Sequence, residues 1–255
     1  MSVFIPIVII VLIYSVVWFL LSIYFKRNDI ADIAWGLGFV IIAWTSFFLS
    51  EYSLIKIIAN SFITIWGLRL SYHIFQRTKN KTEDFRYLKW RNEWKHFYLR
   101  SYLQVFLLQG MFMCIIALPI IFINIENDKE LNWIFILGST IWLFGFLFEA
   151  IADKQLTNFK NNSSKKNKII QIGLWKYSRH PNYFGEVVLW WGIFLMACTK
   201  NNFLYTVASP FLITYLILFV SGIPMLEEKY KNNEEFQEYK KRTSSFFPLP
   251  PKTND

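Results

Sequence analysis

The feature that most constrains this chain is a series of long runs that contain no charged residue. Five such runs cover residues 2–25, 33–50, 101–125, 131–148 and 201–226. Each approaches or exceeds the ~20 residues that a helix needs to cross a hydrocarbon core about 30 Å thick. Two shorter runs, 57–68 and 187–199, reach spanning length when one or two polar residues enter the membrane with them. These runs exclude a soluble enzyme and a disordered chain.

The runs predict an all-α integral membrane protein with about seven transmembrane helices, organised as a single membrane domain over residues 1–255. The first run ends at Lys26-Arg27 and no basic segment precedes it, so we expect a span rather than a cleavable signal peptide. The expected spans are residues 2–25, 33–50, 54–75, 102–123, 131–152, 183–199 and 203–226.

The basic residues are distributed unevenly between the two sides of this arrangement. The segments 26–32, 76–100, 153–180 and 227–255 together carry 23 of the 27 Lys and Arg residues. Positively charged loops remain in the cytoplasm, so the N-terminus is expected outside and the C-terminus inside. The net charge of +9 therefore reflects topology, and no nucleic-acid partner is expected. A positive cytoplasmic rim suits anionic lipid head groups or a phosphorylated cofactor.

Ionisable residues at membrane depth are costly and need a partner or a purpose. Glu149 and Asp153 lie four residues apart at the end of the fifth expected span. Acids at a helix C-terminus oppose the helix dipole and repel each other, so a bound partner is the better explanation. Asp29 and Asp32 open the second span, where either helix capping or a functional role accounts for them.

Two cytoplasmic segments are unusually polar and aromatic. The stretch Glu83-Asp84-Phe85-Arg86-Tyr87 precedes Trp90 and Trp94. An interfacial amphipathic helix explains the tryptophans but not the paired acids, so a functional role stays open there.

The second segment reads Gly-Leu-Trp-Lys-Tyr-Ser-Arg-His-Pro-Asn-Tyr-Phe-Gly-Glu over residues 173–186. Pro181 suits the first turn of a helix, and the free N–H groups there, beside Arg179 and His180, would attract an anion. The alternative is an interfacial helix start with an arginine that reaches toward the lipid head groups.

The string over residues 173–186 resembles the C-terminal signature of the steroid 5α-reductase superfamily, in particular its DUF1295 branch. The resemblance covers nearly the whole chain and is strongest over residues 145–250, the signature region. An Arg-His-Pro-x-Tyr motif followed by a Glu-Glu pair is shared with sterol reductases and with isoprenylcysteine carboxyl methyltransferases. Further matching residues are Asp32-Ile-Ala-Trp35-Gly36, Arg69, Glu83 to Tyr87, Glu149, Asp153, the Glu227-Glu228 pair, Phe236, Tyr239 and Phe246 to Pro248.

The resemblance implies a membrane-embedded oxidoreductase that binds NADPH from the cytoplasmic side. Such an enzyme adds hydride to a C=C bond conjugated to a ketone in a steroid-like or other hydrophobic lipid, as a 3-oxo-5α-steroid 4-dehydrogenase does. No metal ion is implied. By matching position, the resemblance implies cofactor contacts at Arg77, Asp84, Arg86, Tyr87, Asp153, Lys160, Tyr177, Arg179, His180, Asn182, Tyr183, Glu186 and Glu228.

The chain departs from the family pattern at the substrate end. Steroid reductases polarise the ketone with a Gln-Glu pair that starts the second span and with a tyrosine in the third. Here the first position falls near Asp32, and the tyrosine position falls near Trp66, which cannot act as an acid. The nearest phenol is Tyr72. Asp32 and Tyr72 are therefore the expected catalytic residues.

Two other functions remain open on the residues alone. One is an S-adenosylmethionine-dependent methyltransferase of a lipid or prenylated substrate, and the other is a non-catalytic membrane protein or transporter. The Glu83–Tyr87 stretch together with Asp153 favours reduction, because methyl transfer needs no site for an adenosine 2′-phosphate. The expected partners are a hydrophobic lipid substrate and membrane lipids. The expected location is the inner membrane in a bacterium or the endoplasmic reticulum in a eukaryote.

Overall fold

The computed structural model describes residues 3–126, 131–162 and 168–252, and all regular elements within these ranges are helices. In these ranges, six helices are long and apolar enough to cross a membrane, which confirms the expected all-α membrane protein. Their bounds are Phe4–Phe25, Ile30–Phe48, Leu54–Thr78, Phe97–Ile116, Trp133–Asn161 and Phe203–Lys229. The expected span 183–199 corresponds to the helix Pro181–Ala197, which has 17 residues. The seventh crossing and the orientation of the termini stay predictions.

The chain folds into two compact units, each built from two separate stretches. The first unit comprises Met1–Asn132 and Met196–Ser209, and the second comprises Trp133–Leu195 and Pro210–Asp255. The grouping of all 255 residues into one membrane domain stays a prediction.

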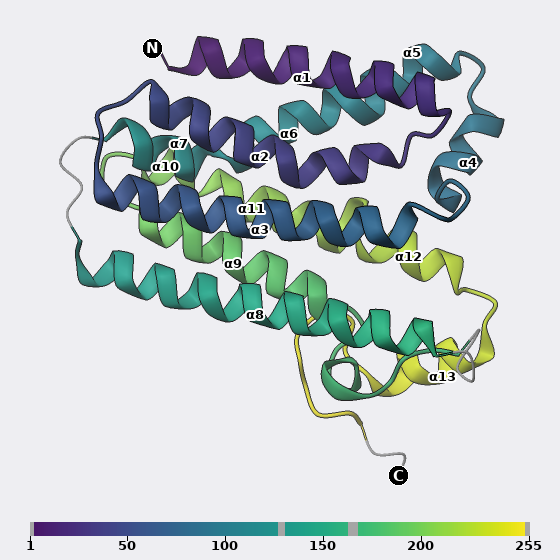
Figure 1. Cartoon of the computed structure of the whole chain (residues 1–255). Coiled ribbons are helices and arrows are strands. Elements are labelled where there is room, and N and C mark those ends of the chain that lie inside the picture. Colours follow the sequence, from purple (N-terminus) through teal and green to yellow (C-terminus); the bar gives the residue numbers. More distant parts are fainter. Residues whose placement is uncertain (1–2, 127–130, 163–167, 253–255) are drawn as a thin grey trace. The chain divides into compact units, whose positions relative to one another are not determined.

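In the first unit, helices α1 (Phe4–Phe25), α2 (Ile30–Phe48) and α3 (Leu54–Thr78) lie side by side, with α2 in contact with both neighbours (Figure 1). Gly36 and Gly67 permit the close packing of α2 and α3. A Cβ atom on either glycine would lie 2.5 Å from the carbonyl oxygen of the other. Small residues of this kind allow transmembrane helix backbones to approach closely.

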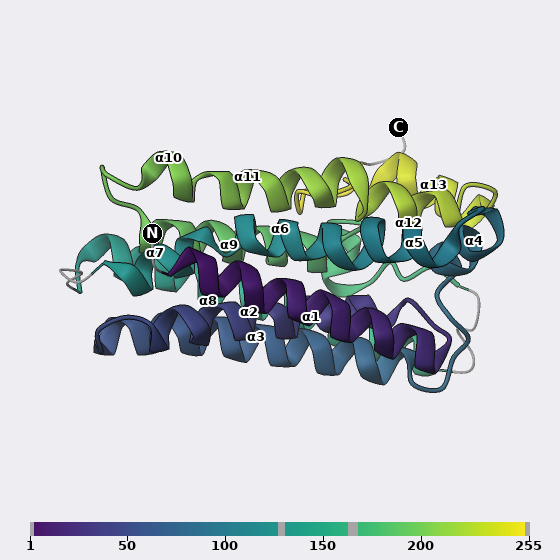
Figure 2. The same cartoon turned by 90° about the horizontal axis from the view of Figure 1, so that it is seen from above.

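The rest of the first unit consists of shorter helices. They are α4 (Phe85–Glu93), α5 (Phe97–Ser101), η1 (Tyr102–Leu107), α6 (Leu108–Ile116), α7 (Leu118–Ile125) and α10 (Phe203–Thr206). The helices α5, η1 and α6 form one run, whose η1 and α6 parts contact α1 (Figure 2). Pro119 lies in the first turn of α7 and cannot continue the preceding helix, which explains the interruption at Ala117.

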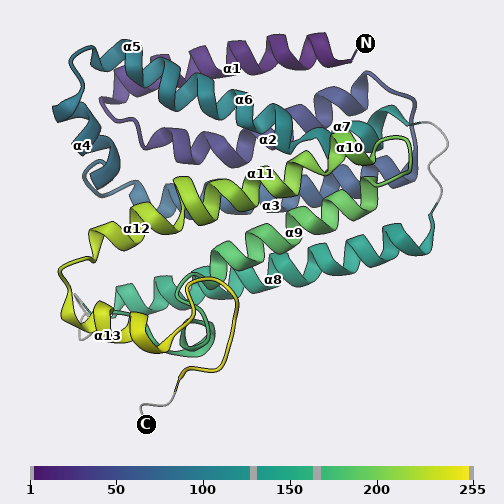
Figure 3. The same ribbon diagram turned by 180° about the vertical axis from the view of Figure 1, so that it is seen from behind.

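The second unit is built on α8 (Trp133–Asn161) and most of α9 (Pro181–Ala197), which lie side by side (Figure 3). It also contains η3 (Gly173–Lys176), most of α11 (Ala208–Tyr215), η4 (Leu216–Val220), α12 (Ile223–Lys229) and α13 (Glu234–Arg242). A Cβ atom on Gly185 of α9 would lie 2.5 Å from the backbone nitrogen of Glu149 of α8. The two backbones therefore nearly touch, and this contact brings the end of α8 to the first turn of α9.

Pro181 is the first residue of α9, as the sequence predicts. Its missing N–H costs nothing in a first turn, where that group has no helical partner. The segment Tyr177 to His180 therefore forms the turn that precedes α9, and we call residues 177–180 the entry turn.

Candidate functional site

The expected catalytic carboxylate, Asp32, lies in the first turn of α2 and accepts hydrogen bonds from two residues of α4. The Arg86 Nη2 atom lies 2.6 Å from Asp32 Oδ2, and the Tyr87 hydroxyl donates to Asp32 Oδ1 at 2.7 Å. Both carboxylate oxygens are thus engaged within the first unit. The structure brings three of the expected site residues together here.

Asp84 places α4 so that these contacts form. Its carboxylate accepts from the backbone N–H of Arg86 at 3.1 Å, which caps the start of α4, and from Arg86 Nε at 2.9 Å. Burial alone would raise the pKa of Asp84, but the Arg86 guanidinium outweighs it and leaves that pKa below its ordinary value. The neighbouring carboxylates raise the pKa of Arg86 despite its burial. Arg86 is therefore a cation shared between two acids.

Tyr87 is 3% exposed and packs with Ala31, Val105 and Phe106 in a hydrophobic cluster. Burial raises the pKa of its hydroxyl, and the Asp32 carboxylate raises it further. The phenol therefore stays protonated and acts as a hydrogen-bond donor.

A second set of ion pairs lies beside this cluster and accounts for the paired acids of the loop before α4. Asp29 accepts two bonds of 2.7 Å from Arg27 and one of 3.0 Å from the backbone N–H of Asp84. Glu83 accepts two bonds of 3.0 Å from Arg91. Glu83 and Asp29 thus hold the loop that ends in Asp84, so part of this polar stretch is structural.

Two expected residues of the first unit lie away from this cluster. Tyr72 is 64% exposed on α3, and the hydroxyl that reaches Asp32 is that of Tyr87. Arg77 is exposed in the last turn of α3, where its charge contributes to lowering the pKa of Asp84.

In the second unit, Arg179 is 7% exposed and its guanidinium is engaged at three nitrogens. Its Nε and Nη2 atoms lie 2.9 and 2.8 Å from Glu227 Oε1. Its Nη1 atom donates to the carbonyl oxygens of Thr243 and of Lys240, the latter at 3.3 Å. Arg179 therefore joins the entry turn to α12 and to the end of α13.

Glu227 also binds two further residues of this cluster, Lys240 and His180. Lys240 Nζ lies 2.9 Å from Glu227 Oε2, and His180 Nε2 lies 3.2 Å from Oε1. Burial lowers the pKa of His180, although the hydrogen bond to Glu227 opposes this. A neutral imidazole with its proton on Nε2 donates to Glu227. The His180 ring also stacks on Tyr183, with 5.7 Å between ring centroids.

Asn182, in the first turn of α9, has a buried amide oxygen that could accept a hydrogen bond from a ligand. Its Nδ2 atom donates to Asp153 Oδ1 at 3.2 Å, while its Oδ1 atom is buried without a hydrogen-bond partner in the described part of the chain. Asp153 and Glu149 of α8 and Glu186 of α9 are also buried. A buried amide oxygen of this kind is normally satisfied, so it is a candidate ligand contact.

The remaining expected residues of the second unit are more exposed. Tyr177 is 41% exposed, and Lys160 is exposed in the last turn of α8. Glu228 pairs only loosely with Lys231, at 3.4 Å, and its side chain is 70% exposed.

The family resemblance implies Glu228, whereas the adjacent Glu227, 11% exposed, is the acid that binds Arg179 and His180. Tyr239 matches the family pattern but was not among the expected site residues; its hydroxyl donates to the carbonyl of Ser178 at 3.1 Å. The sequence contains both glutamates, but it does not show which one is less exposed. That depends on the register of α12, which largely buries Glu227 and exposes Glu228.

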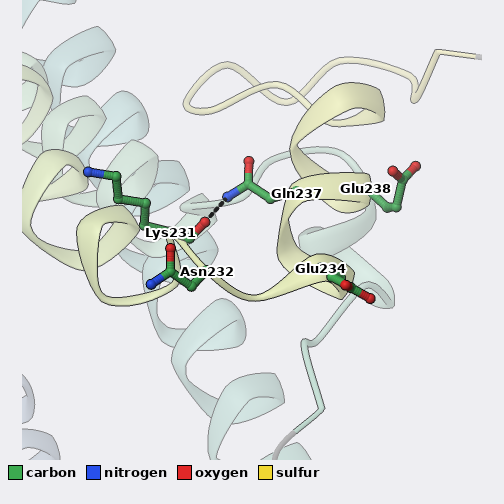
Figure 4. A pocket seen from close by; sticks show the side chains of 5 residues that line it. All are labelled: Lys231, Asn232, Glu234, Gln237 and Glu238. Carbon is green, nitrogen blue, oxygen red and sulfur yellow. Dashed lines mark hydrogen bonds between the residues drawn. The ribbon is translucent and has the colours of Figure 1, made fainter.

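A surface hollow of about 440 Å³ lies between the end of α12 and α13 (Figure 4). It is lined by Lys231, Asn232, Glu234, Gln237 and Glu238. Gln237 Nε2 donates to the Lys231 carbonyl at 2.9 Å across it. The lining is polar and carries both positive and negative charges, so it does not indicate one class of ligand.

The sequence is similar to one described protein family and to several known proteins. The family model described as "Protein of unknown function (DUF1295)" matches residues 18–243. The chain is 30% identical over 116 residues to 3-oxo-5-alpha-steroid 4-dehydrogenase 1 of Bos taurus, covering 45% of this chain and 42% of that protein. It is 34% identical over 87 residues to the steroid 5-alpha-reductase DET2 of Gossypium hirsutum, covering 33% of this chain and 34% of that protein.

An uncharacterised protein of Schizosaccharomyces pombe matches more of the chain, with 22% identity over 72% of this chain and 61% of that protein. The chain thus spans less than half the length of the two steroid reductases with which it aligns. No solved structure matches it significantly. Because the family model covers most of the chain, the protein belongs to the DUF1295 family, a branch of the steroid 5α-reductase superfamily.

Proposed function

We propose that this protein is a membrane-embedded, NADPH-dependent reductase that acts on a C=C bond conjugated to a ketone in a steroid-like or other hydrophobic lipid. The observation that carries the proposal is the buried, unsatisfied Oδ1 atom of Asn182 beside the Asp153 carboxylate. The two side chains present oxygen acceptors at the first turn of α9. Acceptors in this arrangement suit a ligand with hydroxyl or amide N–H donors, which a nicotinamide dinucleotide has on its riboses and carboxamide.

The cofactor, when bound, supplies a hydride for the β-carbon of the enone, and a proton added at the α-carbon completes the two-electron reduction. In the second unit, Asp153 and Asn182 would orient the ribose or the amide, and the exposed Lys160 would meet a phosphate. Arg86 is less suited to that role because two carboxylates already share its charge.

Polarisation of the ketone needs a hydrogen-bond donor, because an ionised carboxylate only accepts. Asp32 is bound by two donors, Arg86 and Tyr87. We therefore propose that Asp32 serves the substrate end by holding these donors in place. The exposed Tyr72 is the weaker candidate acid.

Ligand-induced thermal stabilisation of the purified protein tests this proposal without knowledge of the lipid. A ligand that binds only the folded state adds about 2.7 kcal/mol of stability at a concentration of 100 times its Kd. NADPH should stabilise the protein more than NADH or S-adenosylmethionine does. Asn182→Ala should reduce the NADPH effect, whereas Asn158→Ala, at an exposed site on α8, should leave it unchanged.

Stabilisation by S-adenosylmethionine alone would overturn the reductase proposal in favour of a methyltransferase. Stabilisation by none of the three ligands would contradict both enzyme functions. An NADPH effect that Asn182→Ala leaves intact would remove the first turn of α9 from the cofactor site.

A further inference from the structure

The arginine of the Arg-His-Pro motif is expected to bind a phosphate, yet the structure engages it elsewhere. Arg179 directs Nε and Nη2 to one carboxylate oxygen of Glu227 and Nη1 to two backbone carbonyl oxygens. With 7% of its surface exposed, its planar donor group is turned into the protein rather than toward a ligand. Arginine is suited to such a fork of simultaneous bonds.

The two carbonyls lie at the C-terminal end of α13. Lys240 is in the last turn of that helix, and Thr243 is the residue that follows it. The last carbonyls of a helix have no partner within the helix and carry the negative end of its dipole. Arg179 satisfies two of these orphan acceptors with a cation, so it caps α13 from a distant part of the chain.

Glu227 completes this contact from α12. It neutralises Arg179 and also binds Lys240 of α13 and His180 of the entry turn. One carboxylate thus connects α12, α13 and the turn before α9. Removal of one partner of a buried ion pair lowers the stability of the fold by more than the pair contributes in total, because the remaining charge is left buried without a partner.

The chain after α13 returns along the entry turn, and we call residues 243–249 the return segment. The backbone N–H of Arg179 donates to the Ser244 carbonyl at 2.9 Å, and Ser178 Oγ donates to the Phe246 carbonyl at 2.8 Å. The N–H of Leu249 donates to the Tyr177 carbonyl at 2.9 Å. The position of the entry turn is therefore set by the return segment, which follows the helix that Arg179 caps.

We infer that Arg179 is a positioning residue, which together with Glu227 fixes α13 and the return segment against the entry turn and so sets the direction of Asn182. Arg179 does not hold a cofactor phosphate. The link to cofactor affinity rests on the proposed function, whereas the fixing of the return segment does not.

The two roles of Arg179 predict opposite effects for Glu227→Gln. If Arg179 were a phosphate ligand, removal of the competing carboxylate would free its charge and strengthen binding of a phosphorylated cofactor. If Arg179 positions the entry turn, the same substitution loosens the turn and weakens binding. NADH, which lacks the 2′-phosphate, provides a second comparison.

The experiment uses the full chain with the substitutions Arg179→Lys and Glu227→Gln, and Glu238→Gln as the matched control. Glu238 is an acid of α13 that pairs with Lys241 at the surface. Dissociation constants for NADPH and NADH are measured, and amide hydrogen exchange of residues 243–249 is followed without cofactor. Both test variants should weaken NADPH and NADH by the same factor, about tenfold, and should speed exchange in the return segment. Glu238→Gln should change neither.

Tighter NADPH binding in Glu227→Gln, or a loss in Arg179→Lys that affects NADPH but not NADH, would overturn the inference. Unchanged exchange in the return segment would do the same. If the parent protein binds neither nucleotide, the proposed function fails on its own, and the exchange measurement still decides whether Arg179 fixes the return segment. Should Arg179→Lys not fold, Glu227→Gln, which preserves side-chain size, carries the test.

Discussion

Asp32 illustrates how a single carboxylate can be stabilised beside the hydrophobic part of a membrane protein. It is surrounded by donors on α4, a cation at 2.6 Å and a phenol at 2.7 Å. Charge-assisted bonds of this kind are about twice as strong as neutral ones. The stabilisation of the Asp32 carboxylate therefore depends on the two donors that α4 provides, Arg86 and Tyr87.

Substitution of Tyr87 measures this arrangement directly. Tyr87→Phe keeps the ring in its hydrophobic cluster but removes the hydroxyl that binds Asp32. Hydrogen bonds to charged groups contribute about 1.5–3 kcal/mol, so we expect the free energy of unfolding to fall by about that amount. Chemical unfolding in detergent micelles provides the measurement.

Tyr24→Phe is the control, because Tyr24 is 77% exposed on α1 and its substitution should change stability by less than about 0.5 kcal/mol. If both variants unfold like the parent, the bond between Tyr87 and Asp32 makes no net contribution.

The sequence identified most residues of the candidate site but not their roles. Asp32, Arg86 and Tyr87 were each selected, and the structure places them in contact. Their pairing was not predictable, because it depends on how the loop before α4 folds over the start of α2. Which of Glu227 and Glu228 binds Arg179 likewise depends on the rotation of α12 about its axis. Two adjacent residues of the same type give no indication of that rotation.

At the scale of whole elements, the contact between α8 and α9 brings the site residues of the second unit together. Gly185 lies against the backbone of Glu149, and one turn further along α8 lies Asp153, the partner of Asn182. Glycine is needed because any side chain at this position would separate the two helices. The spacing of the helices and the geometry of the Asp153–Asn182 pair are thus linked.

We expect Gly185→Val to disturb both. Its side chain would start 2.5 Å from the Glu149 nitrogen and 2.6 Å from the Gly145 oxygen, and overpacking of this kind costs roughly 1–3 kcal/mol. Thermal unfolding in micelles should show the loss. Leu147→Val on the exposed face of α8 serves as the control, since Leu147 is 47% exposed. A Gly185→Val protein as stable as its parent would contradict the close backbone contact.

The positions of the helices could be predicted from the charge-free runs, whereas their interruptions could not. Each run longer than 17 residues overlaps a long helix, because the backbone of a span must satisfy its own hydrogen bonds. The break at Ala117 follows from Pro119 and is readable in hindsight. The wider π-helical turns at Tyr102–Leu107 and Leu216–Val220 have no equally clear residue signal.

At the scale of the whole molecule, the uneven distribution of basic residues predicts how the chain crosses the membrane. The orientation can be tested by labelling single cysteines after Cys114 and Cys198 are replaced by alanine. Tyr52→Cys, between α2 and α3, should react with a membrane-impermeant maleimide in intact cells. Lys79→Cys, at the end of α3, should react only after the cells are permeabilised.

Both positions are exposed and lie at opposite ends of α3, so differences in local burial do not explain a difference in labelling. The reverse labelling pattern would place the N-terminus in the cytoplasm and would remove the basis for a cytoplasmic cofactor site.

The return of residues 243–249 along the entry turn has a consequence for the biosynthesis of this protein. Spans of a membrane protein enter the bilayer in order as the ribosome makes them, so α8 and α9 are inserted before the return segment exists. The entry turn is hydrogen-bonded to residues translated more than 60 positions later, through the Phe246 carbonyl, the Tyr239 hydroxyl and the Leu249 N–H group. The entry turn can therefore complete its native hydrogen bonds only after the return segment has been made.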